Sequence, residues 1–548
     1  IPMNRETELH FSEVPFIDKP RSKFNRSNSH KTTFNAGDLV PVFLDMDILP
    51  GDTVKINTSM VVRMATPLYP VMDNAYLDLM YFFVPNRLVW DHWREFWGEN
   101  EDPWAQTVEY EVPQITTSGL NVFTTKSVAD YMGLPIGLEN LSVSALPFRS
   151  YCKIYNDWFR DENLQEACFT TTGDANAVTS AAAYKGGTVL KANKFHDYFT
   201  SALPAPLKAG QSVTIPLGTR APVITGDTHS WASPGLQLGS PNALTNEYTD
   251  LYIKKTAVGL GNLVGDNYAR SEGININEAT IIPTNLWTDL NNATSATISS
   301  LRTAFAVQRF FEAQARGGSR YIEFLKNIFG VTSPDARLQR SEYLGGKRIP
   351  INMMGVAQTG GTNDLSPQGN MAAYSQTADS DDYFTKSFTE HGILIGLAVV
   401  RTDHSYEQGI ERGWSRKKWY DFYVPQFAHL SEQPIRLKEI YATEDTTDNE
   451  TVFGYQEAWA DYRYRKNMIT GAMRSGYAQS LNAWHYGDYY TEEPVLGEIW
   501  IEETPTNIDR TIAVPSQTEN QFIADFYFDC EYVRPMPIYS VPGLIDHF

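Results

Sequence analysis

The stretch Thr53-Val-Lys-Ile-Asn-Thr-Ser-Met-Val-Val-Arg-Met64 alternates between apolar and polar side chains. Successive side chains of a β-strand point to opposite faces of the sheet, so this period of two predicts a strand with one buried face. The buried face is expected to consist of Val54, Ile56, Met60, Val62 and Met64.

A second stretch of the same kind lies just upstream. Its expected face is Val40, Val42, Leu44, Met46 and Ile48. Between the two stretches stands Leu49-Pro-Gly-Asp52. Proline presets φ at the second position of a type II turn and glycine accepts the positive φ of the third, so a tight turn is expected here.

The far end of the chain shows the same alternation. Phe522, Ala524, Phe526, Phe528, Cys530 and Tyr532 share one face, and Asp525, Asp529 and Glu531 share the other. Further strands are expected at 75–84, 393–400 and 495–501. The aromatic content of 13% also suits half-buried pleated surfaces. The pattern therefore predicts an all-β, antiparallel sandwich whose first and last strands both contribute to the core.

Helices are expected to be few and short. Aromatic residues recur at helical spacing within 87–99, 151–164 and 300–315, and Gly317-Gly318 ends the last of these. These stripes are expected to pack against the sandwich rather than to hold a cofactor.

Residues 217–300 differ in composition from the rest of the chain. They contain none of the 28 Phe residues, and their aromatic residues are Trp231, Tyr248, Tyr252, Tyr268 and Trp287. This composition predicts a surface insertion in a core that resumes near Leu301. The expected organisation is therefore an N-terminal arm (1–37), a first core part (38–216), the insertion (217–300) and a second core part (301–548). Residues 357–382 and 442–451 are expected to be polar loops.

Composition and motifs argue against several classes of protein. The chain has 45 Lys and Arg against 65 Asp and Glu, a net charge of −20, so binding of nucleic acid over the whole surface is not expected. The longest apolar run, 393–400, is too short to span a bilayer. The three cysteines are expected to be buried thiols, and the ten histidines lack the spacing of metal ligands. No catalytic motif is found, so neither an enzyme nor a cofactor or metal site is expected.

Two local clusters of basic residues are candidate nucleic-acid contacts. The first contains Lys19, Arg21, Lys23, Arg26 and Lys31, precedes the first expected strand and is predicted to be an extended arm. It is expected either to contact phosphates or to be solvated or clasp another subunit. The second runs from Arg412 to Tyr420 and includes Trp414, Arg416, Lys417 and Lys418. Its interleaved aromatic and cationic side chains suit stacking on unpaired bases, or alternatively a structural loop with cation–π packing.

Several long, ordered stretches match one family from end to end. They are Ser22-Lys-Phe-Asn-Arg-Ser-Asn-Ser-His-Lys-Thr-Thr-Phe34, Leu49-Pro-Gly-Asp52, Thr66-Pro-Leu-Tyr-Pro-Val-Met-Asp-Asn74, Phe82-Phe-Val-Pro-Asn-Arg-Leu-Val-Trp-Asp-His-Trp93, Ala315-Arg-Gly-Gly-Ser-Arg-Tyr321, Phe329-Gly-Val-Thr-Ser-Pro-Asp-Ala-Arg-Leu-Gln339, Glu342-Tyr-Leu-Gly-Gly346, Ser387-Phe-Thr-Glu-His-Gly392 and Phe453-Gly-Tyr-Gln-Glu-Ala-Trp459. The chain resembles the major capsid proteins of the Microviridae, the small icosahedral bacteriophages with single-stranded DNA, and among them the gokushovirus branch. Residues 217–300 are the part that does not match.

The resemblance implies an eight-stranded viral jelly roll with large loop insertions, and about sixty copies in a closed T=1 shell around circular single-stranded DNA. It implies that residues 217–300 form a protrusion at the threefold axes, where Trp231, Tyr248, Tyr252 and Tyr268 are either its small core or contacts to a host cell-surface receptor. It also implies a small basic DNA-packaging protein and a pilot protein as partners, and assembly in the bacterial cytoplasm. No membrane insertion is expected, because the longest apolar run is too short.

Two other classes are weighed against a capsid subunit. A carbohydrate-binding β-sandwich would be a monomer by sedimentation. A glycan hydrolase would need two inward carboxylates in one cleft, and the adjacent pairs Glu492-Glu493 and Glu502-Glu503 do not supply them, because neighbouring residues of a strand point to opposite faces.

Overall fold

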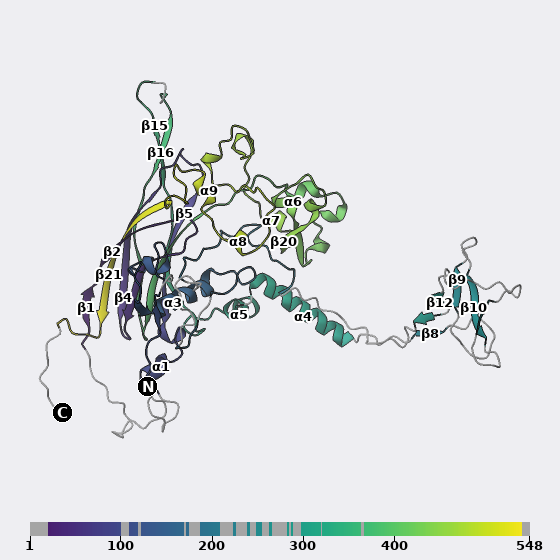
Figure 1. Ribbon diagram of the computed structural model, residues 1–548, viewed down its shortest axis with the longest axis horizontal. Coiled ribbons are helices and arrows are strands. Elements are labelled where there is room, and N and C mark those ends of the chain that lie inside the picture. The colour runs from purple at the N-terminus through teal and green to yellow at the C-terminus, as the bar shows by residue number, and fades with distance from the viewer. Residues whose placement is uncertain are drawn as a thin grey trace, which may run out of the picture. The chain divides into compact units, whose positions relative to one another are not determined.

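The computed structural model describes residues 20–99, 109–118, 122–168, 171–174, 187–208, six short strands between 223 and 288, and residues 298–318, 320–362 and 367–539. The chain divides into two compact units (Figure 1). The first comprises residues 1–208 and 313–548, and the second comprises residues 209–312. The second unit is thus a continuous insertion in the sequence of the first.

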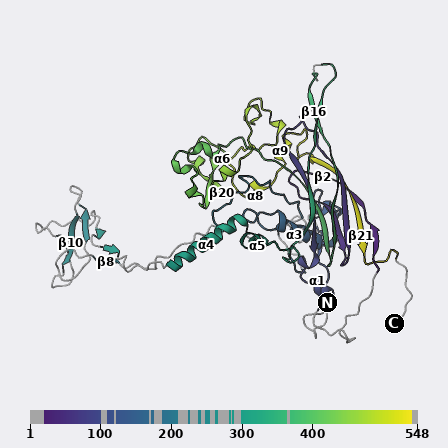
Figure 2. The same cartoon turned by 180° about the vertical axis from the view of Figure 1, so that it is seen from behind.

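One sheet of the first unit contains both ends of the described chain. In spatial order it contains β1 (Ser22–Asn25) and β2 (Asn28–Phe34) at one edge, then β21 (Phe522–Arg534), β4 (Thr53–Met64) and β17 (Thr377–Ser387). All neighbouring strands are antiparallel, and β21 pairs with β4 from Phe522 opposite Met64 to Val533 opposite Thr53. The first and last described strands of the unit are therefore neighbours, as Figure 2 also shows from the opposite side.

The second sheet has four antiparallel strands. In spatial order they are β14 (Glu342–Pro350), β5 (Ala75–Pro85), β18 (Gly392–Thr402) and β3 (Val40–Ile48). β3 and β4 are consecutive in sequence but belong to different sheets, so the turn at 49–52 carries the chain from one sheet to the other. Gly51 has a φ of +93°, as the predicted turn requires.

The main hydrophobic core lies between these two sheets. The apolar face predicted for 53–64 is buried in it, together with the alternate apolar residues of β21. β21 alternates along its length between buried and more exposed positions. β18 instead is buried at nearly every position, because a second core that includes α3 (Leu146–Ile154) covers the other face of its sheet. The apolar run at 393–400 is thus a strand with two covered faces.

The helices are mostly single turns. The single-turn helices are α1 (Trp93–Phe96), α2 (Val128–Tyr131), α6 (Leu437–Ile440), α7 (Ala460–Arg463), α8 (Glu498–Ile501) and α9 (Thr506–Asp509). α5 (Tyr321–Phe329) and α3 have nine residues each, and α3 continues into a π-helical turn at Tyr155–Phe159. α4 (Ile298–Gly317) is longer, with 20 residues. None of the helices that the structure describes combines the length and the apolar content needed to cross a bilayer.

Three small two-stranded sheets complete the first unit. They are β6 (Gln114–Thr116) with β7 (Ser142–Ser144), β15 (Met353–Ala357) with β16 (Met371–Ser375), and β19 (Glu432–Arg436) with β20 (Val452–Glu457). The β15–β16 hairpin projects beyond the end of the sandwich (Figure 1). β19 and β20 belong to a third core that is built mainly from residues between β18 and β21.

The second unit has its own small sheets. One has the order β11 (Asn262–Gly265), β10 (Tyr248–Lys254), β9 (Leu238–Pro241) and β12 (Ile282–Pro283), and the other pairs β8 (Val223–Thr225) with β13 (Leu286–Thr288). With its sheets antiparallel and its helices few, the described chain is an all-β protein, as predicted.

The structure corrects four expectations. Residues 22–34 do not precede the first strand as an extended arm, because they form β1 and β2. Residues 371–382 belong to β16 and β17, not to a polar loop; β17 is an edge strand, where acidic residues are tolerated on the open face. The end of the strand expected at 495–501 is the helix α8. Met46 is exposed, since β3 has an irregular register against β18.

Candidate nucleic-acid interface

The N-terminal basic residues lie at the edge of the first sheet, where each described one contacts its own chain. Lys19 falls outside the described residues. Lys23 Nζ is 2.7 Å from Glu531, and Lys31 Nζ is 3.5 Å from Asp525, both across the pairing with β21. Arg21 donates to the Gly51 and Val533 carbonyls and, at 3.0 Å, to the Thr53 hydroxyl. Lys23 and Lys31 thus have acidic partners in exposed pairs, whereas Arg21 is held by uncharged oxygens of its own subunit.

Arg26 differs from its neighbours because its partner is buried. Its guanidinium donates to both carboxylate oxygens of Asp45, at 3.1 and 3.0 Å, while Asp45 is only 3% exposed in its side chain. Asp47 lies 3.2 Å away, and the Tyr532 hydroxyl also donates to Asp45. Although burial lowers it, Asp45 and its neighbours raise the pKa of Arg26. The role of this arginine in the fold is structural.

The second basic cluster begins in a 3-10 turn at Arg412–Ser415. Trp414 is 83% exposed. Arg416 forms an ion pair with Asp461 and lies 4.2 Å from the centre of the Tyr462 ring. The backbone amides of Lys417 and Lys418 donate to Asp421, which lowers the pKa of that carboxyl group. This geometry leaves the Trp414 ring open while it fixes the backbone around it.

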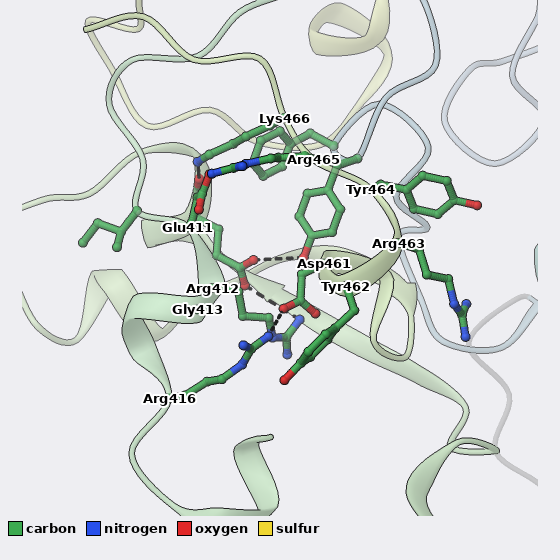
Figure 3. A pocket seen from close by; sticks show the side chains of 14 residues that line it. Glu411, Arg412, Gly413, Arg416, Asp461, Tyr462, Arg463, Tyr464, Arg465 and Lys466 are labelled. Carbon is green, nitrogen blue, oxygen red and sulfur yellow. Dashed lines mark hydrogen bonds and ion pairs between the residues drawn. The ribbon is translucent and has the colours of Figure 1, made fainter. Parts of the chain in front are cut away.

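A cavity of about 410 Å³ brings this cluster together with a second segment (Figure 3). The second segment is Tyr462-Arg-Tyr-Arg-Lys466, which alternates tyrosine with cations, and its Tyr462 and Tyr464 side chains are exposed. The cavity lining has five cationic residues against three acidic ones: Arg412, Arg416, Arg463, Arg465 and Lys466 against Glu411, Glu439 and Asp461. Trp414, Lys417 and Lys418 do not line it. The sequence reasoning missed the segment 462–466, although its alternation is the same signal that identified 412–420.

The ionisable side chains of the cavity range from buried ones at its inner wall to exposed ones at its rim. Glu439 is buried, 3.9 Å from Arg412, and accepts a hydrogen bond of 3.0 Å from Tyr198. Burial lowers the pKa of Arg412, but Glu439 and Tyr198 outweigh this and raise it. Lys466 donates to the Glu439 carbonyl at 2.6 Å, and burial lowers its pKa. Arg465 at the rim is 77% exposed, 3.4 Å from Glu411. The rim therefore presents cations and tyrosine rings to solvent.

The aromatic residues proposed for the insertion are only partly placed. Trp231 and Tyr268 lie outside the described residues. Tyr248 and Tyr252 belong to β10, opposite Pro241 of β9 and Val264 of β11.

A separate buried cluster surrounds His404 at the end of β18. Its Nδ1 is 2.9 Å from Asp488 and its Nε2 is 2.9 Å from Glu503. Asn507 donates to Asp488 at 2.6 Å and Thr402 donates to Glu503 at 2.9 Å. Burial alone would lower the pKa of His404, but the two carboxylates raise it to about 10, while His404 holds the pKa of Asp488 well below its usual value despite burial. Both nitrogens of this buried imidazolium are paired with carboxylates, so the cluster acts as a structural clamp.

Within the part of the chain that the structure describes, no group of three His, Cys, Asp or Glu residues is placed to hold a metal ion.

Comparison with known proteins gives one consistent result. A family model described as capsid protein (F protein) matches residues 12–544. The chain is 41% identical to capsid protein VP1 of Bdellovibrio phage phiMH2K, over 100% of this chain and 99% of that protein. It is 40% identical to capsid protein VP1 of Spiroplasma virus 4, over 96% and 95%, and 39% identical to capsid protein VP1 of Chlamydia phage 1, over 97% of each. The chain belongs to the F-protein family of phage capsid proteins, which are structural proteins and not enzymes.

Proposed function

We propose that this chain is the major capsid protein of a small single-stranded DNA bacteriophage of the Microviridae, and that about sixty copies assemble into a T=1 icosahedral shell around the genome. The observation that carries the proposal is the match to capsid proteins along the whole chain, at about 40% identity to three of them. The protein would then reside in the virion after assembly in the bacterial cytoplasm.

The sandwich is proposed to be an eight-stranded viral jelly roll. Counting β1 and β2 together as the first strand, the core strands in chain order are β2, β3, β4, β5, β14, β17, β18 and β21. The first sheet then has the order first, eighth, third, sixth, and the second has the order second, seventh, fourth, fifth. The chain passes from one sheet to the other at every step except between the fourth and fifth strands, which are neighbours in the second sheet, and this strand order supports a double Greek key.

Exposed apolar side chains support self-assembly. α5 has no buried residue, although Tyr321 and Phe329 are among its apolar side chains. The β15–β16 hairpin exposes Met354, Val356, Met371 and Tyr374. A two-stranded sheet is marginally stable alone, and large exposed apolar patches mark protein–protein contacts. Copies of the same chain are the partner expected in a shell.

Electron microscopy of the purified protein tests the proposal. Closed particles of uniform size are expected at low ionic strength. A carbohydrate-binding sandwich, the alternative function, would sediment as a monomer under all conditions and would be retained on a column of immobilised glycan. Purely monomeric protein across salt and pH would contradict the proposed self-assembly.

The hairpin gives a sharper prediction about assembly. The double substitution Met354→Thr and Val356→Thr removes two exposed apolar side chains from one face of β15, while threonine keeps a high strand propensity. The subunit is expected to fold normally, with particle yield reduced severalfold in sedimentation and electron microscopy. Val452→Thr, at an equally exposed valine of β20, is the control for the chemical change. Normal yield from the double variant would show that the hairpin lies outside the subunit contacts.

The proposals about the genome and the partner proteins rest on the net charge of the chain and on its resemblance to the family. Each subunit has a net charge of −20, so a shell of this chain adds negative charge to a negative genome, and a small basic DNA-packaging protein is proposed to neutralise it. A pilot protein and a host cell-surface receptor are the other proposed partners. Residues 217–300 are proposed as the threefold protrusion that contributes to host attachment.

For the local DNA contact, the rim of the cavity is favoured over the N-terminal basic residues, because it places the exposed rings of Tyr462 and Tyr464, which can stack on bases, beside its cations. Its Arg463 and Arg465 are ion-paired with Glu457 and Glu411, much as Lys23 and Lys31 are paired with Glu531 and Asp525, so ion pairing alone does not separate the two sites. We expect Arg463→Ser with Arg465→Ser to lower the DNA content of purified particles, measured by the ratio of absorbances at 260 and 280 nm. The slope of log K against log salt concentration for oligothymidine binding should become shallower by about 1.4, about 0.7 for each lost phosphate contact on a single strand. The matched control, Lys23→Ser with Lys31→Ser, should leave both measurements unchanged. The reverse pattern would place the DNA contact at the sheet edge.

A further inference from the structure

Two of the three cysteines lie in contact in the core that covers the outer face of the second sheet. Cys152 is in α3 and Cys168 is 16 positions further along the chain. Their Sγ atoms are 3.0 Å apart, and both residues are buried, with exposures of 0% and 2%. A disulfide has an S–S distance of about 2.05 Å, so bond formation requires an approach of only about 1 Å.

The surrounding hydrogen bonds hold the two sulfurs together independently of any bond between them. Asn156 Nδ2 donates to the Cys168 carbonyl at 2.9 Å, and the Cys168 amide donates to Asn156 Oδ1 at 2.8 Å. α3 is fixed by Tyr151, whose hydroxyl donates to the Leu39 carbonyl at 2.8 Å. The pair is therefore positioned by hydrogen bonds that do not involve the sulfur atoms.

We propose that Cys152 and Cys168 are a cross-linking site, at which the subunit forms an internal disulfide when it meets a hydroperoxide outside a reducing compartment. One thiol reduces hydrogen peroxide to water and becomes a sulfenic acid. The second thiol then attacks that sulfur, the S–S bond forms, and a second water leaves. Overall, two thiols and one peroxide give one disulfide and two waters. This goes beyond the proposed capsid function, which requires no covalent bond.

Cys530 provides an internal comparison within the same chain. It is also buried, but in the core between the two sheets, and burial raises its pKa to about 12. It has no neighbouring thiol with which to complete the second step. The cross-link is therefore expected to be specific to one pair, although all three cysteines are buried to a similar degree.

The cross-link would close a short loop next to the sandwich. It would join α3, which packs on β5 and β18, to the segment that Asn156 holds beside it. A loop of this size restricts the unfolded chain, so the oxidised protein is expected to unfold roughly 3 °C higher than the reduced protein.

Counting free thiols tests the proposal. Purified protein is incubated with hydrogen peroxide or with dithiothreitol, and is then denatured in N-ethylmaleimide. The reduced sample should carry three labels, and the oxidised sample should carry one, on Cys530, with an intact mass before labelling lower by about 2 Da. Peptide mapping without reduction should find Cys152 joined to Cys168.

Two variants separate this site from general oxidation. Cys530→Ala should still form the cross-link and keep the rise in unfolding temperature, whereas Cys168→Ala should lose both. If Cys168→Ala does not fold, the wild-type protein and Cys530→Ala still decide the question. Three labels after oxidation, or a cross-link that contains Cys530, would overturn the proposal.

Discussion

Replacing His404 by glutamine is expected to lower the free energy of unfolding by about 3–5 kcal/mol. The imidazolium lies between two buried carboxylates, 2.9 Å from Asp488 on one side and 2.9 Å from Glu503 on the other. Glutamine can still form hydrogen bonds but carries no charge, so the two buried carboxylates would lose the cation between them and only Lys194 would remain as a nearby positive charge for Asp488. The loss of one partner from a buried ionic cluster costs more than the cluster itself contributes, because the remaining charges stay desolvated.

The position of His404 explains why the effect should be large. His404 lies two residues beyond the end of β18 at Thr402, while Asp488 and Glu503 come from the long segment between β18 and β21. The cluster therefore ties this segment to the end of the central sheet strand. Urea unfolding followed by tryptophan fluorescence measures the effect. His196→Gln is the matched control, since His196 is exposed, and it should change stability by less than about 0.5 kcal/mol. Equal stability of the two variants would show that the cluster is not charged.

The same cluster predicts a dependence on pH. The pKa of His404 is raised to about 10 in the folded protein, from about 6.5 in an unfolded chain. Its contribution is therefore complete below pH 6.5 and is lost as the pH rises through 10, with a slope approaching about 1.4 kcal/mol per pH unit. Asp488, whose pKa is lowered, contributes in the opposite direction and loses its contribution in acid. His404→Gln should remove the alkaline slope, measured between pH 6.5 and 10.

The strands that could be predicted from the sequence are those with one face in the main core. Residues 53–64 and 522–532 alternate because one side of their sheet faces the core and the other does not. The failures have physical reasons. β17 contains four acidic or hydroxyl residues in succession, Asp379 to Asp382, and is a strand only because β4 pairs with it. α8 lies within the short, mostly apolar run 495–501, which is too short for its periodicity to distinguish a helix from a strand.

The candidate site was predicted only in its local part. Residues 412–418 could be recognised from residue types, but the contact of Arg416 with Asp461 and Tyr462 joins segments that are 45 positions apart. No local pattern specifies such a contact. For the N-terminal residues, the acidic face of 525–531 was visible in the sequence, yet its pairing with Lys23 and Lys31 depends on the register of β1 and β2 against β21.

That register leads to the second large effect, at Arg26. Arg26→Ser is expected to lower the free energy of unfolding by about 2–3 kcal/mol, because it removes the cationic nitrogen that donates to both oxygens of the buried Asp45 carboxylate. The expected loss is smaller than for a fully buried pair because the Arg26 side chain is 37% exposed, so that water can enter and partly solvate Asp45 when the arginine is removed. The measurement is the urea midpoint of the unassembled subunit, with an unchanged slope.

Lys23→Ser provides the comparison that separates structure from DNA contact. Lys23 lies on β1, three residues before Arg26, and is paired with a carboxylate of β21, Glu531, at 2.7 Å. Both side chains of this pair are exposed. Its removal should cost no more than about 1 kcal/mol. If the N-terminal basic residues acted as one solvated DNA-binding arm, the two substitutions would have equal, small effects on stability and equal effects on DNA content. Because Asp45 is buried and Glu531 is not, we expect Arg26→Ser to unfold at clearly lower urea concentration than Lys23→Ser, before any DNA is present.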